Sequence, residues 1–127
     1  MILLTDTGRA EIDDPECVMD LIRQLESEGK DCIVVEKCEG LHITVLPRPD
    51  HYVVIFEDYK TSRGILNASR APMESTDTVS LKVGGTPTPI PRNMCLKRDV
   101  GLQVVRDFCR TGEPSPLVYW LRDAPRV

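Results

Sequence analysis

The two histidines of this chain are the first residues to consider as catalytic or metal-binding groups. His42 and His51 lie on neighbouring predicted strands, where a hairpin could bring them together. A zinc site would need a third ligand, and a catalytic triad would need a nucleophile beside the histidine base. The simpler interpretation places both side chains at the surface or the rim of a sheet.

A second group of polar residues follows the third predicted strand. Ser62 and Arg63 in "TSRG" could form an anion pocket with nearby amides, although a turn residue and an exposed arginine are the simpler interpretation. Glu57 and Asp58 are adjacent, so on a strand their side chains point to opposite faces and make a poor acid/base pair.

One glycine-rich stretch, "KVGGTPTP", also follows a strand. A phosphate-binding loop would continue into Gly-Lys-Ser/Thr and a helix, whereas prolines follow here. We therefore expect no catalytic residue, no metal site and no cofactor, and the pattern favours a binding protein over an enzyme.

Length and charge narrow the class of protein. A chain of 127 residues is expected to form a single domain, residues 1–127. Its net charge of −4 argues against direct nucleic-acid binding, which favours a basic surface. Residues 1–39 contain eleven acidic and four basic residues, whereas the rest of the chain has a small basic excess. The acidic third could steer a basic partner, although solubility alone is the simpler explanation.

The cysteines and the N-terminus bear on location. Five cysteines form an odd set without Cys-x-x-Cys spacing, and Cys17, Cys32 and Cys109 lie in or beside apolar runs. We expect these three cysteines to be buried as small hydrophobic residues, in a protein that works in a reducing compartment. The start "MILLTDTGRAEIDD" has neither a basic segment nor a long apolar run, so we expect no signal peptide and no membrane span. The expected location is the cytoplasm.

The clearest element is a helix over residues 14–28. Asp13 or Asp14 can cap its first turn, Pro15 suits the first helical position, and Gly29 can end it. An apolar stripe follows the i, i+3, i+4, i+7 spacing of a helix with one buried face. Glu16 and Asp20 lie on the opposite, outer face.

Strand patterns fill the middle of the chain. Residues 32–37, 41–46 and 52–56 are rich in β-branched residues and are separated by short turns, which predicts antiparallel neighbours. Further strands are expected around Ile65, over 78–83 and in "PLVYWL", with an exposed loop between the first two. In "GGTPTPIP" the prolines lack amides, which predicts an extended crossover rather than a central strand.

A second helix is expected over residues 97–110, with Gly112 as its cap. Gly101 in this helix would permit a close approach to the sheet. In the last strand, alternation allows either Trp120 or Tyr119, but not both, to close the core. The expected fold is therefore α+β: an antiparallel sheet of about five to six strands with these two helices packed on it.

The order of motifs in the second half adds a resemblance. "YKTSRG", "VGGTPTPIP" and "VVRDFCRTGEPSPLVYW" follow one another as in the first-numbered family of immunity proteins from bacterial polymorphic toxin systems, which this chain resembles. The residues that carry the resemblance are Tyr59, Ser62, Arg63, Gly64, Gly84, Gly85, Pro91, Phe108, Arg110, Thr111, Gly112, Pro114 and Trp120.

The resemblance implies an inhibitor that binds a cognate secreted toxin, a nucleic-acid deaminase or a nuclease, and covers its basic active cleft. The protein would be a monomer, or a 1:1 heterodimer with the toxin. Expected contacts are the outer helix face and the strand-turn segment: Glu16, Asp20, Glu57, Asp58, Tyr59, Ser62 and Arg63. Two alternatives stay open: a chaperone for a secreted effector, and a small-ligand or enzymatic domain using Ser62, Arg63 and the histidines.

Overall fold

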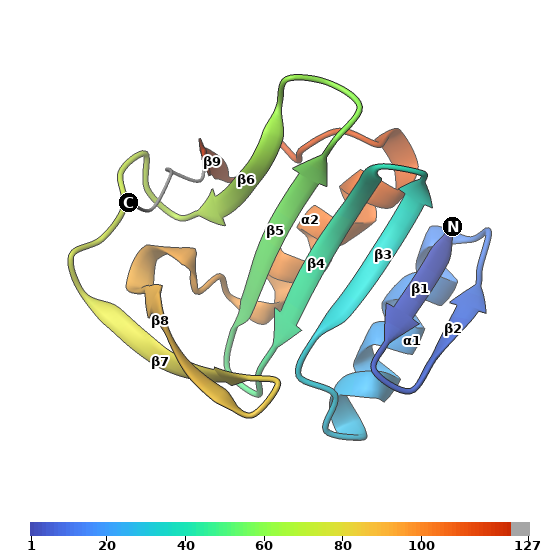
Figure 1. Ribbon diagram of the computed structural model, residues 1–127, viewed down its shortest axis with the longest axis horizontal. Helices are drawn as coiled ribbons and strands as arrows, with labels where there is room; N and C mark the ends of the chain where they lie inside the picture. The colour runs from blue at the N-terminus through green and yellow to red at the C-terminus, as the bar shows by residue number, and fades with distance from the viewer. Residues whose placement is uncertain (123–127) are drawn as a thin grey trace.

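The computed structural model describes residues 1–122 and has a seven-stranded antiparallel sheet at its centre (Figure 1). The strands of this sheet lie in the order β2 (Gly8–Glu11), β1 (Ile2–Thr5), β3 (Ile33–Cys38), β4 (Leu41–Pro47), β5 (Tyr52–Asp58), β6 (Gly64–Ser69) and β9 (Tyr119–Arg122). The predicted α+β class is confirmed. The predicted count of five to six strands was too low, because the four-residue strands β1 and β2 are too short to show a clear alternation.

Two helices cover one face of this sheet, behind it in Figure 1: α1 (Pro15–Ser27) and α2 (Arg98–Thr111). Both lie within about one residue of the predicted ranges. The Asp14 side chain accepts a hydrogen bond from the Glu16 amide at 3.0 Å and so caps α1. Helix α2 ends at Gly112, its C-cap, which takes a left-handed conformation with φ of 74°.

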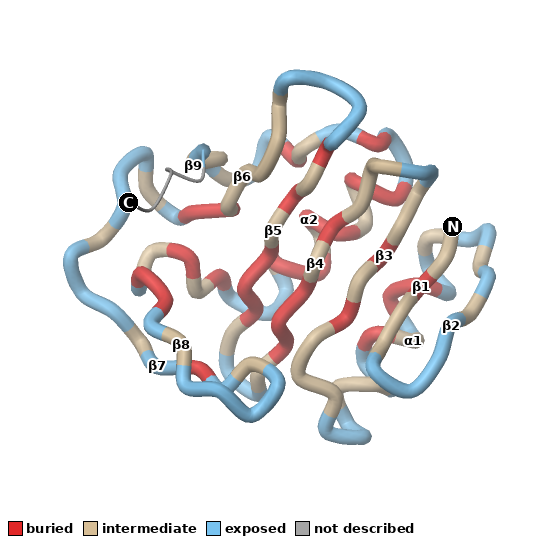
Figure 2. Tube along the Cα trace, viewed as in Figure 1, coloured by how far each residue is buried: buried red, intermediate tan, exposed pale blue. Residues whose placement is uncertain are grey.

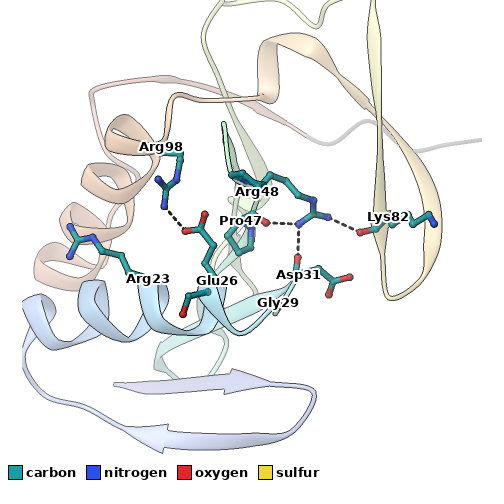
Figure 3. A pocket seen from close by; sticks show the side chains of 10 residues that line it. Arg23, Glu26, Gly29, Asp31, Pro47, Arg48, Lys82 and Arg98 are labelled. Carbon is teal, nitrogen blue, oxygen red and sulfur yellow. Dashed lines mark hydrogen bonds and ion pairs between the residues drawn. The ribbon is translucent and has the colours of Figure 1, made fainter.

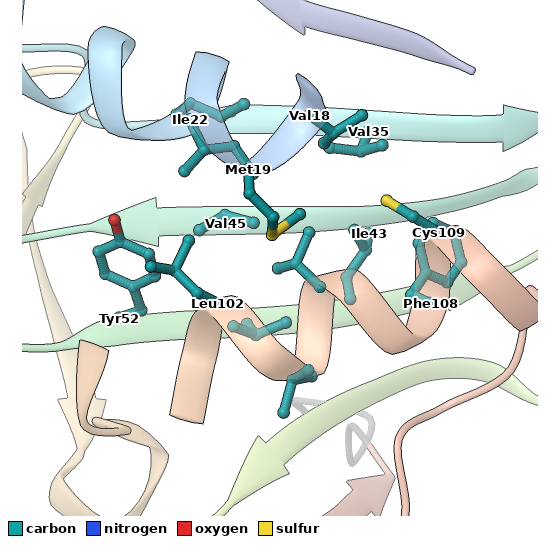
Figure 4. Close-up of a cluster of buried hydrophobic side chains, with 14 of the residues drawn as sticks. Val18, Met19, Ile22, Val35, Ile43, Val45, Tyr52, Leu102, Phe108 and Cys109 are labelled. Carbon is teal, nitrogen blue, oxygen red and sulfur yellow. The ribbon is translucent and has the colours of Figure 1, made fainter. Parts of the chain in front are cut away.

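The main core fills the layer between the helices and the central strands, where the buried segments of Figure 2 meet. Figure 4 shows Met19 of α1 reaching toward the side chains of β4, while Phe108 of α2 lies beside Cys109. Phe108 packs edge-on against Phe56 of β5, with ring centroids 6.0 Å apart. The apolar stripe that predicted α1 and the apolar side of α2 are therefore the surfaces that pack against the sheet.

Gly101 permits the close approach of α2 to β5 that the sequence suggested. A Cβ atom at this position would lie 2.7 Å from the Cβ of Tyr52. Tyr52 is fully buried, and its hydroxyl donates a hydrogen bond of 2.5 Å to Glu26 of α1. Burial, together with this hydrogen bond to Glu26, raises the pKa of Tyr52 to about 12.

The segment predicted as a crossover is a strand. β7 (Thr78–Val83) and β8 (Thr86–Pro91) form a separate two-stranded antiparallel sheet, followed by the short 3₁₀ helix η1 (Arg92–Met94). Amides along a strand point alternately to its two sides, so Pro87, Pro89 and Pro91 all lack an amide on the same side. The amides of Thr86, Thr88 and Ile90 stay available for pairing with β7.

This hairpin packs on the sheet face opposite the helices. Its Leu81 and Ile90 form a second apolar cluster with Leu46 of β4 and Val53 of β5. Leu46 and Val53 are paired across the strands and alternate with the residues that face the helices. The hairpin thus covers the ends of β4 and β5 and leaves the rest of that face uncovered.

The structure of β9 shows which of its two aromatic residues, Tyr119 or Trp120, faces the core. Trp120 packs against the main core, 6.1 Å from Phe56 between ring centroids, and its indole donates to the Ser115 carbonyl at 2.7 Å. Tyr119 points outward and is exposed. The prediction that one of the pair closes the core is confirmed, and β9 does so at the edge of the sheet, beside β6.

Candidate functional site

The turn from β5 to β6 is built around the carboxylate of Asp58. This carboxylate is buried and accepts hydrogen bonds from the Thr61 hydroxyl at 2.8 Å, the Lys60 amide at 2.9 Å and Arg63 Nε at 2.9 Å. The hydrogen bond from Thr61, with those from Arg63 and the Lys60 amide, outweighs burial and lowers the pKa of Asp58 to about 2. Asp58 therefore holds the turn in shape.

Arg63 links this turn to the loop after α2. Its guanidinium lies 5.0 Å from the centroid of the Phe56 ring and forms ion pairs with Asp58 and Glu113. The hydrogen bond to Asp58 raises the already high pKa of Arg63. Beside it, Ser62 is exposed, and its carbonyl accepts from Arg122 at 3.2 Å.

Glu57, which precedes Asp58 on β5, points to the other face of the sheet from Asp58. It lies at the centre of a cluster that the sequence analysis did not predict. Its carboxylate accepts from the Thr44 hydroxyl at 3.2 Å and from the Tyr59 hydroxyl, and it lies 3.1 Å from His42 Nε2. The Tyr59 ring lies 5.7 Å from the His42 ring and is 60% exposed. The hydrogen bond to Glu57 raises the pKa of Tyr59.

The signal for this cluster is the register of the β4–β5 hairpin. His42 is the cross-strand partner of Glu57. Counting outward from the turn "PRPD" pairs Leu46 with Val53 and then His42 with Glu57.

The two histidines do not come together. His51 lies at the other end of the hairpin, where its Nδ1 is 2.9 Å from an Asp50 carboxylate oxygen.

The acids predicted on the outer face of α1 already have cationic partners within the chain. Glu16 accepts from Arg106 Nε at 2.7 Å and from Arg110 Nη2 at 3.4 Å, both on α2. Asp20 pairs with Arg23 at 3.1 Å, one turn along its own helix. The residues of the predicted site therefore lie on two different faces of the molecule. Glu16 and Asp20 lie on the helix side and are paired with arginines, whereas Glu57 and Tyr59 lie together on the sheet face opposite the helices.

A cleft of about 580 Å³ lies between the end of α1, the end of β4 and the β7–β8 hairpin (Figure 3). Arg48 Nη2 donates to the Lys82 carbonyl at 2.6 Å, and Arg48 Nη1 donates to the Asp31 carbonyl at 3.1 Å. Glu26 accepts from Arg98 at 2.7 Å. Arg48 thus joins the hairpin to the segments beside β3 and β4, and Arg98 joins the start of α2 to the end of α1. Ser62, Arg63, His42 and His51 lie outside the cleft lining.

Three further observations concern the described part of the chain. Within residues 1–122 no group of three or more His, Cys, Asp or Glu side chains is placed to hold a metal ion. Neither helix there has the length and apolar character that crossing a membrane requires. Cys109 is buried as expected, whereas Cys17 is exposed, so the prediction of a buried Cys17 was wrong.

The fold is an α+β scaffold whose candidate residues lie on helix α1, on a sheet face and in a tight turn rather than in the lining of the cleft of Figure 3. Its sequence matches the family "Immunity protein Imm1" over residues 7–122. The protein therefore belongs to the Imm1 family of immunity proteins, as the order of its motifs predicted. The comparison with curated proteins found no match.

Proposed function

We propose that this protein binds a cognate secreted toxin and neutralises it by covering its active cleft, without bond-making chemistry of its own. The observation that carries the proposal is the family match over most of the chain. The toxin we expect acts on nucleic acid, as a deaminase or a nuclease, and its cleft is accordingly basic. The acidic net charge of −4 suits such a partner.

The same proposal covers the setting of the interaction. The protein acts in the cytoplasm as a single domain, a monomer that forms a 1:1 heterodimer with the toxin and contacts neither nucleic acid nor membrane directly. Of the expected contacts, Glu57, Tyr59 and Ser62 are the best placed, since Asp58 and Arg63 are engaged in holding the turn. Glu16 and Asp20 are weaker candidates because arginines already pair with them.

Co-expression tests this function. We expect the neighbouring gene to encode the toxin as its C-terminal domain, as the family membership implies. This domain is produced in a bacterial host alone and together with the immunity protein, and survival is counted. We expect the domain to kill alone and to be harmless in the presence of this protein, with both chains eluting as one complex. A domain that is harmless alone, or that still kills in the presence of this protein, would reject the proposal.

A further inference from the structure

The sheet face opposite the helices is uncovered beyond the β7–β8 hairpin. There the strand register aligns two rows of side chains that cross the sheet. The acidic row consists of Glu11, Ile2, Glu36, His42, Glu57 and Ile65. The second row mixes apolar and polar residues and consists of Arg9, Leu4, Val34, Thr44, Ile55, Asn67 and Leu121.

The carboxylates of the acidic row differ from those of α1 in their partners. Among residues 1–122, no hydrogen bond or ion pair engages the side chains of Glu11 and Glu36. Glu57 accepts from two hydroxyl groups and contacts His42, and no lysine or arginine of the described part of the chain forms an ion pair with it. The row therefore keeps its negative charge available to a cation from outside the chain.

An apolar groove borders the acidic row. It has a volume of about 360 Å³ and lies between strands β1 and β3 and the tip of the hairpin. Leu4, Cys32 and Val34 contribute to its lining from the sheet, and Val83 and Gly84 contribute from the hairpin. A groove beside a charged row offers a partner both a pocket for an apolar side chain and a charged rim, as protein interfaces do.

We propose that the toxin docks on this uncovered sheet face, with lysine or arginine side chains over the acidic row and an apolar side chain in the groove. Tyr59, which lies beside Glu57 and His42 of the acidic row, is the anchor: its ring is exposed, and an arginine stacked on it would also reach Glu57. The occupant is a basic protein surface because the unpaired charge of the row is negative. This docking surface rests on the proposed function.

Binding kinetics test the docking surface against the helix face. The purified C-terminal domain encoded by the neighbouring gene is immobilised, and association and dissociation are recorded for wild type, Tyr59→Ala, Glu36→Lys and Asp20→Lys. The last two reverse one exposed or half-exposed charge and change the net charge equally, so Asp20→Lys is the matched control. Circular dichroism and thermal unfolding establish that each variant is folded.

We expect Glu36→Lys to weaken binding by about tenfold, mainly through slower association at low salt, because rim charges act on the association rate. Tyr59→Ala should weaken binding by about thirtyfold, the loss typical of a hot-spot residue. Asp20→Lys should stay within about twofold of wild type, as expected for a residue outside the interface.

The opposite pattern, with Asp20→Lys impaired and Glu36→Lys and Tyr59→Ala unchanged, overturns the docking surface and leaves the immunity function standing. Failure of the wild-type protein to bind overturns both. Light scattering of the wild type adds one more outcome: a dimer that Glu36→Lys dissociates would make this face a contact between copies of the chain and would overturn the toxin assignment.

Discussion

Replacing Gly101 with alanine tests how closely α2 approaches the sheet. The new methyl carbon would lie 2.7 Å from Tyr52 Cβ and 3.1 Å from Tyr52 Cδ2. Carbon atoms in contact lie about 3.5–4.0 Å apart, so the overlap is about 1 Å. Tyr52 cannot retreat easily, because Glu26 holds its hydroxyl and Leu96 pairs with both its amide and its carbonyl. The helix must therefore lift away from β5.

The size of the effect follows from two opposing contributions. Overpacking a core costs about 1–3 kcal/mol, and a tightly held neighbour places this site toward the upper end. Alanine recovers about 1 kcal/mol of helix propensity relative to glycine. We expect Gly101→Ala to lower the free energy of unfolding by about 1–2 kcal/mol, which for a chain of this length lowers the melting temperature by about 4–8 °C.

The assay is urea unfolding followed by circular dichroism, with Gly8→Ala as the matched control. Gly8 lies on β2 without a positive φ, and apart from Gly8 and its two chain neighbours no atom of the described residues lies within 4 Å of the place its Cβ would take. The control should therefore be neutral or slightly stabilising. A Gly101→Ala protein as stable as wild type would refute the claim that contact with Tyr52 requires glycine here.

Two other predictions concern ionisable groups. The pKa of Asp58 is lowered from 3.8 to about 2, so its carboxylate stabilises the folded state above about pH 4, and this contribution is lost as the pH falls through about 2. Urea midpoints measured across this range should fall more steeply for wild type than for Asp58→Asn, and parallel profiles would contradict the role of the turn. Burial raises the pKa of Cys109 to about 11, whereas Cys17 and Cys38 are exposed. A thiol reagent near neutral pH should label Cys17 and Cys38 quickly and Cys109 only after unfolding, as peptide mass mapping would show; equal labelling of all three in the native protein would count against the buried position of Cys109.

The helices and central strands could be predicted because their signals are local. A cap, an apolar stripe and a terminating glycine all lie within residues 14–29, and the close approach at Gly101 was visible as a glycine in a helix. Strand β8 was missed because its prolines argue against a central strand, while a strand paired on one side tolerates them.

The candidate site was harder to predict because it depends on pairing across the chain. Glu16 looked like a free acid, yet its partner Arg106 lies 90 residues away in the sequence and meets it only when the two helices pack together. Asp58 looked like a surface acid, yet the turn that follows folds back over it. Tyr59, by contrast, was named as a candidate contact from its residue type alone, and its side chain is exposed.

Because both helices lie on one face of the sheet, only part of the sequence is constrained by their packing. Along each central strand, residues that hold the helices alternate with residues that point away from them: Phe56 is followed by Glu57, and Val35 by Glu36. Exchanges at the outward positions leave the packing around α1 and α2 intact. Lineages can therefore change the outward residues that the β7–β8 hairpin leaves uncovered, while the alternate positions keep the architecture constant from one descendant to the next.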